Sequence, residues 1–193
     1  MLHHIRALSI PILTEEFRLE LLEEAQSYPL RYINNSMGRG KNEVRQEMFL
    51  QTQLCMNGAF GELVRDFQTL FNDSIAGCDL FDADVVFNDW IIQKYVPGCI
   101  GITPHRDRTD YRHMICLFVL SGHGRFHISR DRVKTGSMEV VNLPGDVILM
   151  PGPGFKGMSH RPFHYLEDVT TDRWIFGLRH DETRLSGNHD SSG

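Results

Sequence analysis

Two segments in the first half of the chain have apolar residues at helical spacing. Thr14 can cap a helix over residues 15–27, with Phe17, Leu21 and Leu22 on one face. A second helix is predicted over about 57–74, where apolar side chains recur at i, i+3, i+4 and i+7 spacing. We interpret this stripe as core packing rather than a binding surface; it comprises Phe60, Leu63, Val64, Phe67, Leu70 and Phe71.

Beyond residue 80 the pattern changes to short apolar or alternating runs that are separated by turn residues. The segments SGHG, LPGD and TTD are typical of turns in antiparallel hairpins. Residues 32–53 also indicate two strands joined by a glycine-containing turn. Strands are predicted at 84–96, 114–120, 124–130, 137–142, 146–150, 163–169 and 173–180.

This order of elements predicts an α+β protein. Two helices followed by seven or eight short strands favour a β-sandwich or a squat barrel. The 193 residues suit one domain that buries a full core without disulfides. We expect that domain over residues 1–182, followed by a polar, flexible tail over residues 183–193, which is rich in Gly and Ser.

The charge and cysteine content limit which binding partners and which cellular compartment the sequence favours. The net charge of −5 gives no global attraction to nucleic acid or to anionic membranes. The four cysteines are scattered without a CxxC pair, and no apolar run is long enough to span a bilayer. With no apolar leader, these features predict a reduced, cytoplasmic protein without a membrane partner. We interpret one local basic stretch as a solvated hairpin; it contains Arg125, Arg130, Arg132 and Lys134.

Candidate chemistry centres on TPHRDRTD, residues 103–110. A kinase catalytic loop, which also contains His-Arg-Asp, is excluded because Arg112 stands where that loop requires asparagine. A solvated loop is the alternative, since His-x-Asp alone is a weak signal. The pair follows an apolar strand and a turn, WIIQKYVPG, which can direct both side chains from a strand end. We therefore treat His105 and Asp107 as candidate metal ligands.

A metal site needs at least one more ligand, and two downstream histidines are candidates. His164 begins an alternating strand and would be held rigidly, whereas His160 lies in a Gly-rich loop. We favour His164 and keep His160 as the alternative; His113 is a candidate for supporting the ligands or contacting substrate. Two histidines and one carboxylate form the facial triad of non-haem Fe(II) oxygenases, which leaves coordination positions open. Zinc is less favoured, because its structural sites are closed and prefer Cys and His.

A second signal is the segment RWIFGLR, residues 173–179. Arg173 and Arg179 are separated by six residues, so they project from the same face of a strand. Buried arginines require carboxylate or phosphate partners, and a dicarboxylate cosubstrate would explain at least one of them. A pair of surface arginines on an edge strand is the alternative interpretation.

The ordered set of His-x-Asp, a distal His and Arg-x5-Arg resembles the Fe(II)/2-oxoglutarate-dependent dioxygenase superfamily, and within it the AlkB-like branch. The segment QKYVPG (93–98) is similar to the family's Asn-x-Tyr-x-Pro-Gly strand end. The segment LPGDV (143–147) resembles the Gly-Asp turn that precedes the distal histidine. The resemblance covers roughly residues 85–180.

This resemblance implies a double-stranded β-helix (jelly-roll) core over about 84–180, with the N-terminal helices packed on one sheet. His105, Asp107 and His164 would bind Fe(II). The cosubstrate 2-oxoglutarate would be decarboxylated to succinate while a substrate C–H is hydroxylated, or demethylated where the carbon is an N-methyl. The residues implied in cosubstrate binding are Arg173, Tyr95, Gln93 and Arg179.

Departures from the family pattern bear on the substrate. Gln93 replaces the usual Asn, and Ile175 replaces an Asn of the RxNxTxR strand. The interval from His164 to Arg173 is shorter than in the DNA-repair members, whereas the interval from His160 is closer to theirs. These features favour hydroxylation of a small-molecule or amino-acid-like substrate.

Two other functions are kept as alternatives. One is AlkB-type demethylation of DNA or RNA bases, which needs basic and aromatic groups around a flipped base. The other is a cupin-like metal-binding module without oxygenase activity. Residues that could form a lid over nucleic acid are Arg31, Tyr32, Arg39, Lys41, Arg45 and Phe49.

Overall fold

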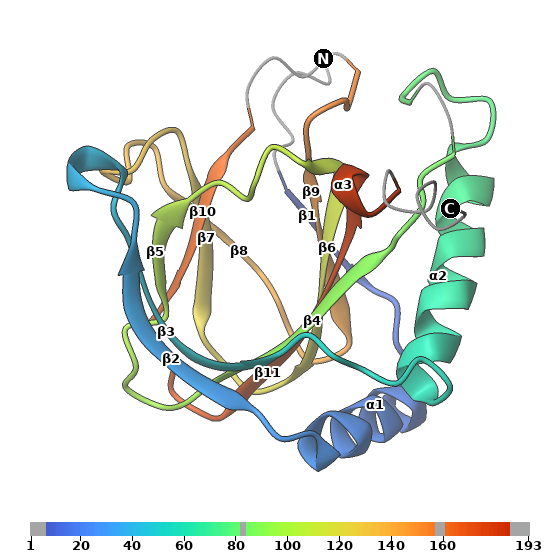
Figure 1. The fold of residues 1–193 in the computed structure, drawn as a ribbon, viewed down its shortest axis with the longest axis horizontal. Coiled ribbons are helices and arrows are strands. Elements are labelled where there is room, and N and C mark those ends of the chain that lie inside the picture. Colours follow the sequence, from blue (N-terminus) through green and yellow to red (C-terminus); the bar gives the residue numbers. More distant parts are fainter. Residues whose placement is uncertain (1–6, 82–83, 157–160, 186–193) are drawn as a thin grey trace, which may run out of the picture.

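The computed structural model describes residues 7–81, 84–156 and 161–185 (Figure 1). Its helices are α1 (Glu15–Ser27), α2 (Ala59–Ile75) and α3 (Glu182–Leu185), with a 3-10 turn at Gly40–Asn42. No helix in these ranges is long and apolar enough to cross a membrane. The strands are β1 (Leu8–Pro11), β2 (Arg31–Met37), β3 (Val44–Gln51), β4 (Asp89–Tyr95), β5 (Ile102–His105), β6 (Tyr111–Ser121), β7 (Arg125–Ser129), β8 (Met138–Val140), β9 (Asp146–Pro151), β10 (Phe163–Glu167) and β11 (Arg173–Asp181).

Both predicted amphipathic helices are confirmed. The hydroxyl oxygen of Thr14 accepts a hydrogen bond from the Phe17 backbone N–H at 3.3 Å, which caps α1 as expected. The buried stripe on α2 is narrower than predicted, because Leu70 is 52% exposed. The stripe residues that are buried are Phe60, Leu63, Phe67 and Phe71.

The predicted strand over 84–96 is partly wrong, because only β4 pairs with other strands. Side chains of α2 satisfy the backbone of the preceding residues instead. The amide oxygen of Asn72 accepts a hydrogen bond from the Val85 N–H at 3.1 Å. The amide oxygen of Gln68 accepts one from the Phe87 N–H at 2.7 Å. These bonds fix the chain against α2 and leave no ladder for a strand there.

The strands form one sheet that curls into a nearly closed barrel. Their order is β1-β9-β6-β11-β4-β3-β5-β10-β7-β8, and β2 pairs with β3. β3 contacts β4 on one side and meets β5 on the other, at Gln46 opposite Ile102, which joins the two halves of the barrel. Figure 1 shows α1 and α2 on the outside of the half that contains β4, β6 and β11. This is the predicted double-stranded β-helix with the N-terminal helices packed on one sheet.

Strand alternation divides β11 between two environments. Trp174, Phe176 and Leu178 belong to the apolar cluster beneath the helices. Arg173 and Arg179 project to the opposite side and line a pocket inside the barrel. Because successive side chains of a strand point to opposite faces, the strand presents its polar groups to the interior while it anchors the core.

Replacing Phe176 by alanine is expected to destabilise the fold. Phe176 is fully buried, and its ring centroid lies 4.5 Å from that of Phe60. Removing a buried phenylalanine ring costs about 3–5 kcal/mol in the free energy of unfolding, because contacts are lost and a cavity forms. The melting temperature should fall by roughly 10 °C, as measured by circular dichroism.

The exposed Leu70→Ala substitution is the matched control, and it should change the free energy of unfolding by less than about 0.5 kcal/mol. Equal melting temperatures for the two variants would show that the helix–sheet layer is not the main core.

Candidate metal centre

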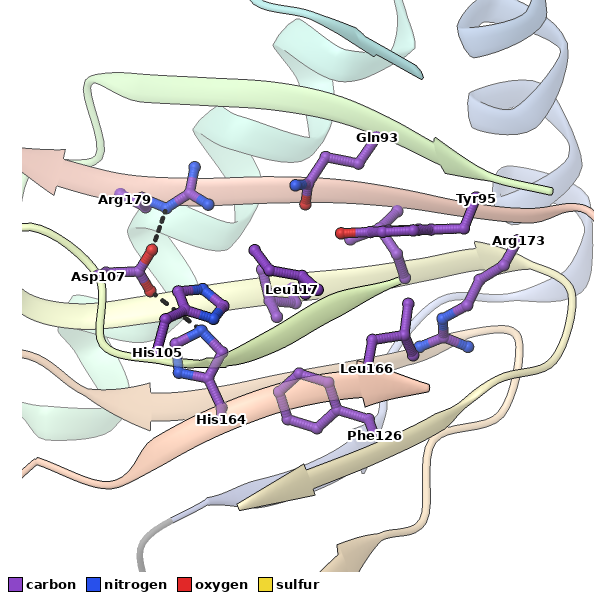
Figure 2. Close-up of a pocket in the computed structure, with 12 residues that line it drawn as sticks. Gln93, Tyr95, His105, Asp107, Leu117, Phe126, His164, Leu166, Arg173 and Arg179 are labelled. Atoms are coloured by element: carbon purple, nitrogen blue, oxygen red, sulfur yellow. Dashed lines mark ion pairs between the residues drawn. The ribbon is translucent and has the colours of Figure 1, made fainter. Parts of the chain in front are cut away.

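The three predicted ligands converge at one end of the barrel. His105 is the last residue of β5, and His164 lies opposite it in the register of β5 and β10. Asp107 follows two residues beyond the end of β5. One ligand atom from each of the three residues lies within 4.8 Å of the other two. Figure 2 shows the three side chains directed toward one another.

Hydrogen bonding prepares His105 for a metal ion. Its Nδ1 lies 3.0 Å from the carbonyl oxygen of Thr103, which can only accept, so Nδ1 carries the proton. The lone pair of Nε2 is therefore available as a ligand. Sequence reasoning did not identify Thr103 in this role, because a backbone carbonyl has no signature in the sequence.

The Asp107 carboxylate has the properties of an unsatisfied metal ligand. Its Oδ2 lies 3.5 Å from Nε2 of His164. This oxygen is buried and has no hydrogen-bond partner within the described residues. A buried carboxylate oxygen without a partner is costly. A divalent cation between the carboxylate and the two imidazoles would remove that cost, so the residues fit a metal ion.

The protonation states also suit metal binding. Burial, together with the nearby His105, lowers the pKa of His164 to about 3. Burial raises the pKa of Asp107, but nearby positive charge, including that of Arg179, outweighs this effect and holds the pKa below its ordinary value. The imidazole is therefore neutral and the carboxylate ionised, which are the states that a metal requires.

Arg179 lies at the metal end of the pocket. Its Nε is 3.9 Å from Oδ1 of Asp107, and its NH1 is 3.6 Å from Oδ2 of Asp89. A Cβ on Gly177 would come within 3.3 Å of that guanidinium, so the glycine leaves room for it. Asp89 stands opposite Arg179 in the register of β4 and β11. The sequence analysis missed Asp89, and only the strand pairing could have identified it.

A second arginine occupies the other end of the pocket. Arg173 is 1% exposed, and its Nε and NH1 have no hydrogen-bond partner within the described residues. Burial lowers its pKa to about 10, while the nearby Tyr95 raises it. Tyr95 is the cross-strand partner of Arg173, and burial raises the pKa of its hydroxyl. The alternative of surface arginines is therefore wrong for Arg173.

A single pocket extends from the proposed metal ligands to Arg173. It has an empty volume of about 460 Å³, including space that opens to solvent. Figure 2 shows the metal ligands at one end, Tyr95 and Arg173 at the other, and apolar side chains between them. The apolar lining consists of Ile102, Leu117, Phe126, Leu166 and Ile175. Such a site is apolar in its walls and polar at two points, as small-molecule sites usually are.

Gln93 also lines this pocket. Its amide nitrogen lies 3.1 Å from Sδ of Met48, and Ile175 stands opposite it in the strand register. Gln93 and Ile175, the two residues that depart from the family pattern, therefore lie side by side on the pocket wall.

Other candidate residues lie elsewhere. His160 falls outside the described residues, so its position is not compared with that of His164. His113 has a positive φ of 62° and its ring stacks edge-on against Phe81 and His180, away from the pocket. Arg125 of the basic stretch pairs with Glu139 and carries the exposed ion pairs of an ordinary surface hairpin.

The segment proposed as a nucleic-acid lid forms the β2–β3 hairpin, as two strands joined by a turn. Tyr32 is half exposed, but its ring lies 4.9 Å from that of Phe49 and its hydroxyl donates to Glu47 at 3.0 Å. Both aromatic rings therefore pack against each other within the hairpin.

Comparisons with known proteins identify the fold. No protein-family model matches the sequence, and no curated protein matches it. Several solved structures do match over most of both chains. A prolyl-4-hydroxylase from Pseudomonas putida is 15% identical, with a TM-score of 0.64 over 91% of this chain and 92% of that one.

Two further matching structures contain bound ligands. The viral collagen prolyl hydroxylase of Paramecium Bursaria Chlorella virus-1, in its 2-oxoglutarate complex, is 16% identical, with a TM-score of 0.64 over 90% of this chain and 94% of that one. HygX from Streptomyces hygroscopicus, with nickel, 2-oxoglutarate and hygromycin B bound, is 12% identical, with a TM-score of 0.59 over 92% and 83%. At these identities the likeness establishes the fold. The chain has the double-stranded β-helix of the Fe(II)/2-oxoglutarate oxygenases, and no AlkB-like branch is singled out.

Proposed function

We propose that the chain is an Fe(II)- and 2-oxoglutarate-dependent dioxygenase that hydroxylates a C–H bond of a small-molecule or amino-acid-like substrate. One observation carries the proposal. Arg173 is a fully buried guanidinium without a hydrogen-bond partner on Nε or NH1, and it lines the same pocket as the His-Asp-His cluster. A buried cation needs a paired anion, and a dicarboxylate that reaches the metal would supply one.

Different residues of the pocket would have different roles in such a site. His105, Asp107 and His164 would hold Fe(II) on one face. When bound, the iron and 2-oxoglutarate supply the oxidation: dioxygen is consumed, succinate and carbon dioxide are formed, and one oxygen atom enters the substrate C–H bond. Arg179 would hold Asp107 in place through the contact between Nε and Oδ1. The apolar walls would exclude water from the reacting atoms.

Arg173 and Tyr95 would bind the remote carboxylate of 2-oxoglutarate. Arg173 offers a planar guanidinium that matches a carboxylate bidentately. Because burial raises the pKa of Tyr95, its hydroxyl stays protonated at neutral pH and can donate a hydrogen bond. Gln93, on the same wall, would contribute a further amide donor.

The solved neighbours support hydroxylation rather than base demethylation. Two of them are prolyl hydroxylases, and another binds hygromycin B. With a net charge of −5, this chain also lacks the overall basic character of a nucleic-acid-binding domain. A small organic substrate therefore remains the favoured class.

The first prediction concerns the metal. His164→Ala is expected to weaken binding of Mn(II), a redox-stable substitute for Fe(II), by at least about 100-fold, because loss of an outer partner alone costs about 10–100-fold. Electron paramagnetic resonance of free Mn(II) measures the binding.

His123→Ala, which changes an exposed histidine on the β6–β7 turn, is the matched control and should bind Mn(II) normally. His160→Ala separates the two candidate distal ligands, since it should also retain binding. Loss of Mn(II) binding in His160→Ala but not in His164→Ala would assign the ligand to His160.

The second prediction concerns the cosubstrate. Arg173→Gln is expected to raise the Kd for 2-oxoglutarate by about 10-fold to 100-fold, because a hydrogen bond to a charged group contributes about 1.5–3 kcal/mol. Titration calorimetry in the presence of Mn(II) measures the change.

Fe(II)-dependent release of succinate should also be lower in Arg173→Gln than in the unmodified chain, and His105→Ala should abolish it. Arg125→Gln, which alters an arginine with carboxylate partners on the surface, is the control. Unchanged 2-oxoglutarate affinity in Arg173→Gln would exclude the proposed orientation of the cosubstrate, and no 2-oxoglutarate binding by the unmodified chain would refute the proposed function.

A further inference from the structure

Three arginines from three different loops meet beside the metal centre. Arg106 lies in the β5–β6 loop, Arg132 in the β7–β8 loop and Arg161 two residues before β10. The guanidinium carbons of Arg106 and Arg132 are 4.1 and 5.3 Å from the ring centroid of Phe163. Arg106 and Arg161 line a small cavity together with two of the proposed metal ligands, Asp107 and His164. We call these three residues the arginine rim.

Backbone contacts hold two members of the rim in place. Arg132 donates from NH1 to the carbonyl oxygen of Pro104 at 3.0 Å. Arg161 donates from NH1 to the carbonyl oxygen of Asp107 at 2.9 Å. Each bond uses one N–H group of a guanidinium that has five. The remaining donors of both side chains are therefore available next to the metal ligands.

The charges of Arg132 and Arg161 have no acidic partner within the described residues. No carboxylate there lies within 4.0 Å of either guanidinium, whereas Arg125, on the same β7–β8 hairpin, contacts both Glu139 and Asp168. The rim is thus locally positive on a chain whose net charge is −5. Arg132 lies close to the centre, because the carbonyl oxygen that it contacts belongs to Pro104, the residue before His105.

We propose that the arginine rim binds an oxyanion, either phosphate or carboxylate, that belongs to the primary substrate. This inference rests on the proposed function, because it names the substrate class of the same site. Guanidinium groups bind phosphate and carboxylate bidentately. Contact with the Phe163 ring limits the motion of Arg106 and Arg132. Anchoring the charged end of the substrate on the rim leaves its uncharged part to extend over the metal.

Phosphate is expected to bind more tightly than carboxylate. A phosphate monoester carries a charge of about −1.5 to −2 at pH 7 and three acceptor oxygens. It therefore offers the remaining donors of Arg132 and Arg161 more charge and more acceptor atoms than a carboxylate does. Two members of the rim contact a single ring, and the neighbouring pocket has an empty volume of about 460 Å³, which suits a small molecule rather than an extended polyanion.

The test uses three probes that share a ring and differ in charge: phenyl phosphate, benzoate and benzyl alcohol. Each is titrated calorimetrically into the full chain loaded with Mn(II) and saturating 2-oxoglutarate under argon, so that Arg173 is already occupied. We expect phenyl phosphate to bind most tightly, benzoate more weakly and benzyl alcohol not measurably. Arg132→Gln and Arg161→Gln should each weaken phenyl phosphate binding by about tenfold.

Arg125→Gln is the matched control, because it removes an arginine from the same hairpin that already has acidic partners; it should bind phenyl phosphate as the unmodified chain does. Circular dichroism and Mn(II) affinity are measured for every variant. Arg132→Gln serves as the second variant if Arg161→Gln disturbs Asp107.

The same titration in Arg173→Gln without metal or 2-oxoglutarate separates this inference from the proposed function. Binding of phenyl phosphate there, with no binding of 2-oxoglutarate by the unmodified chain, would refute the oxygenase but retain the arginine rim as an anion site. Normal Mn(II) and 2-oxoglutarate binding with no preference for the anionic probes would refute the rim alone. A single-stranded oligonucleotide that binds while phenyl phosphate does not would assign the positive charge to nucleic acid, against our proposal.

Discussion

Burial of charge inside the barrel is the constraint on which the rest of the structure depends. β11 places two guanidinium groups on its inner face, and the apolar side chains of its outer face are fixed beneath the helices. Because the outer face cannot shift without exposing Phe176 and its neighbours, the inner groups cannot leave the interior. The helices therefore do more than stabilise the domain: they hold the charges of the pocket in position from behind.

The two buried arginines are neutralised in different ways. Arg179 has its compensation within the chain, because Asp89 and Asp107 lie on either side of it. Arg173 forms no ion pair within the described residues, Tyr95 is its cross-strand partner, and burial lowers its pKa to about 10. The positive charge at the Arg179 end of the pocket is thus balanced by carboxylates of the chain, whereas the positive charge of Arg173 is balanced only when an anion binds. This asymmetry gives a dicarboxylate a direction in the pocket, with its remote end away from the metal ligands.

Local patterns in the sequence were sufficient for most elements and pointed to the residues that the fold brings together in the candidate site. Thr14 and the stripe on α2 predicted the helices, and alternation along 163–169 and 173–180 predicted β10 and β11. Two strands were missed for physical reasons. β5 is four residues long and contains Pro104, and β1 is a four-residue strand at the edge of the sheet, so both are too short for their alternation to stand out from the neighbouring residues. The partners of the site residues, such as Asp89 and Thr103, depend on strand register and on backbone groups, which a single sequence does not display.

The direct pairing of His105 with His164 across β5 and β10 has a consequence for assembly of the protein. A slip of one residue between these strands would turn one imidazole to the outside of the barrel, because neighbouring side chains alternate between faces. Only the correctly registered barrel can then bring both rings to the same ion. The metal would bind preferentially to molecules in which β5 and β10 pair in this register. It would therefore stabilise the correctly folded barrel over forms in which the register has slipped.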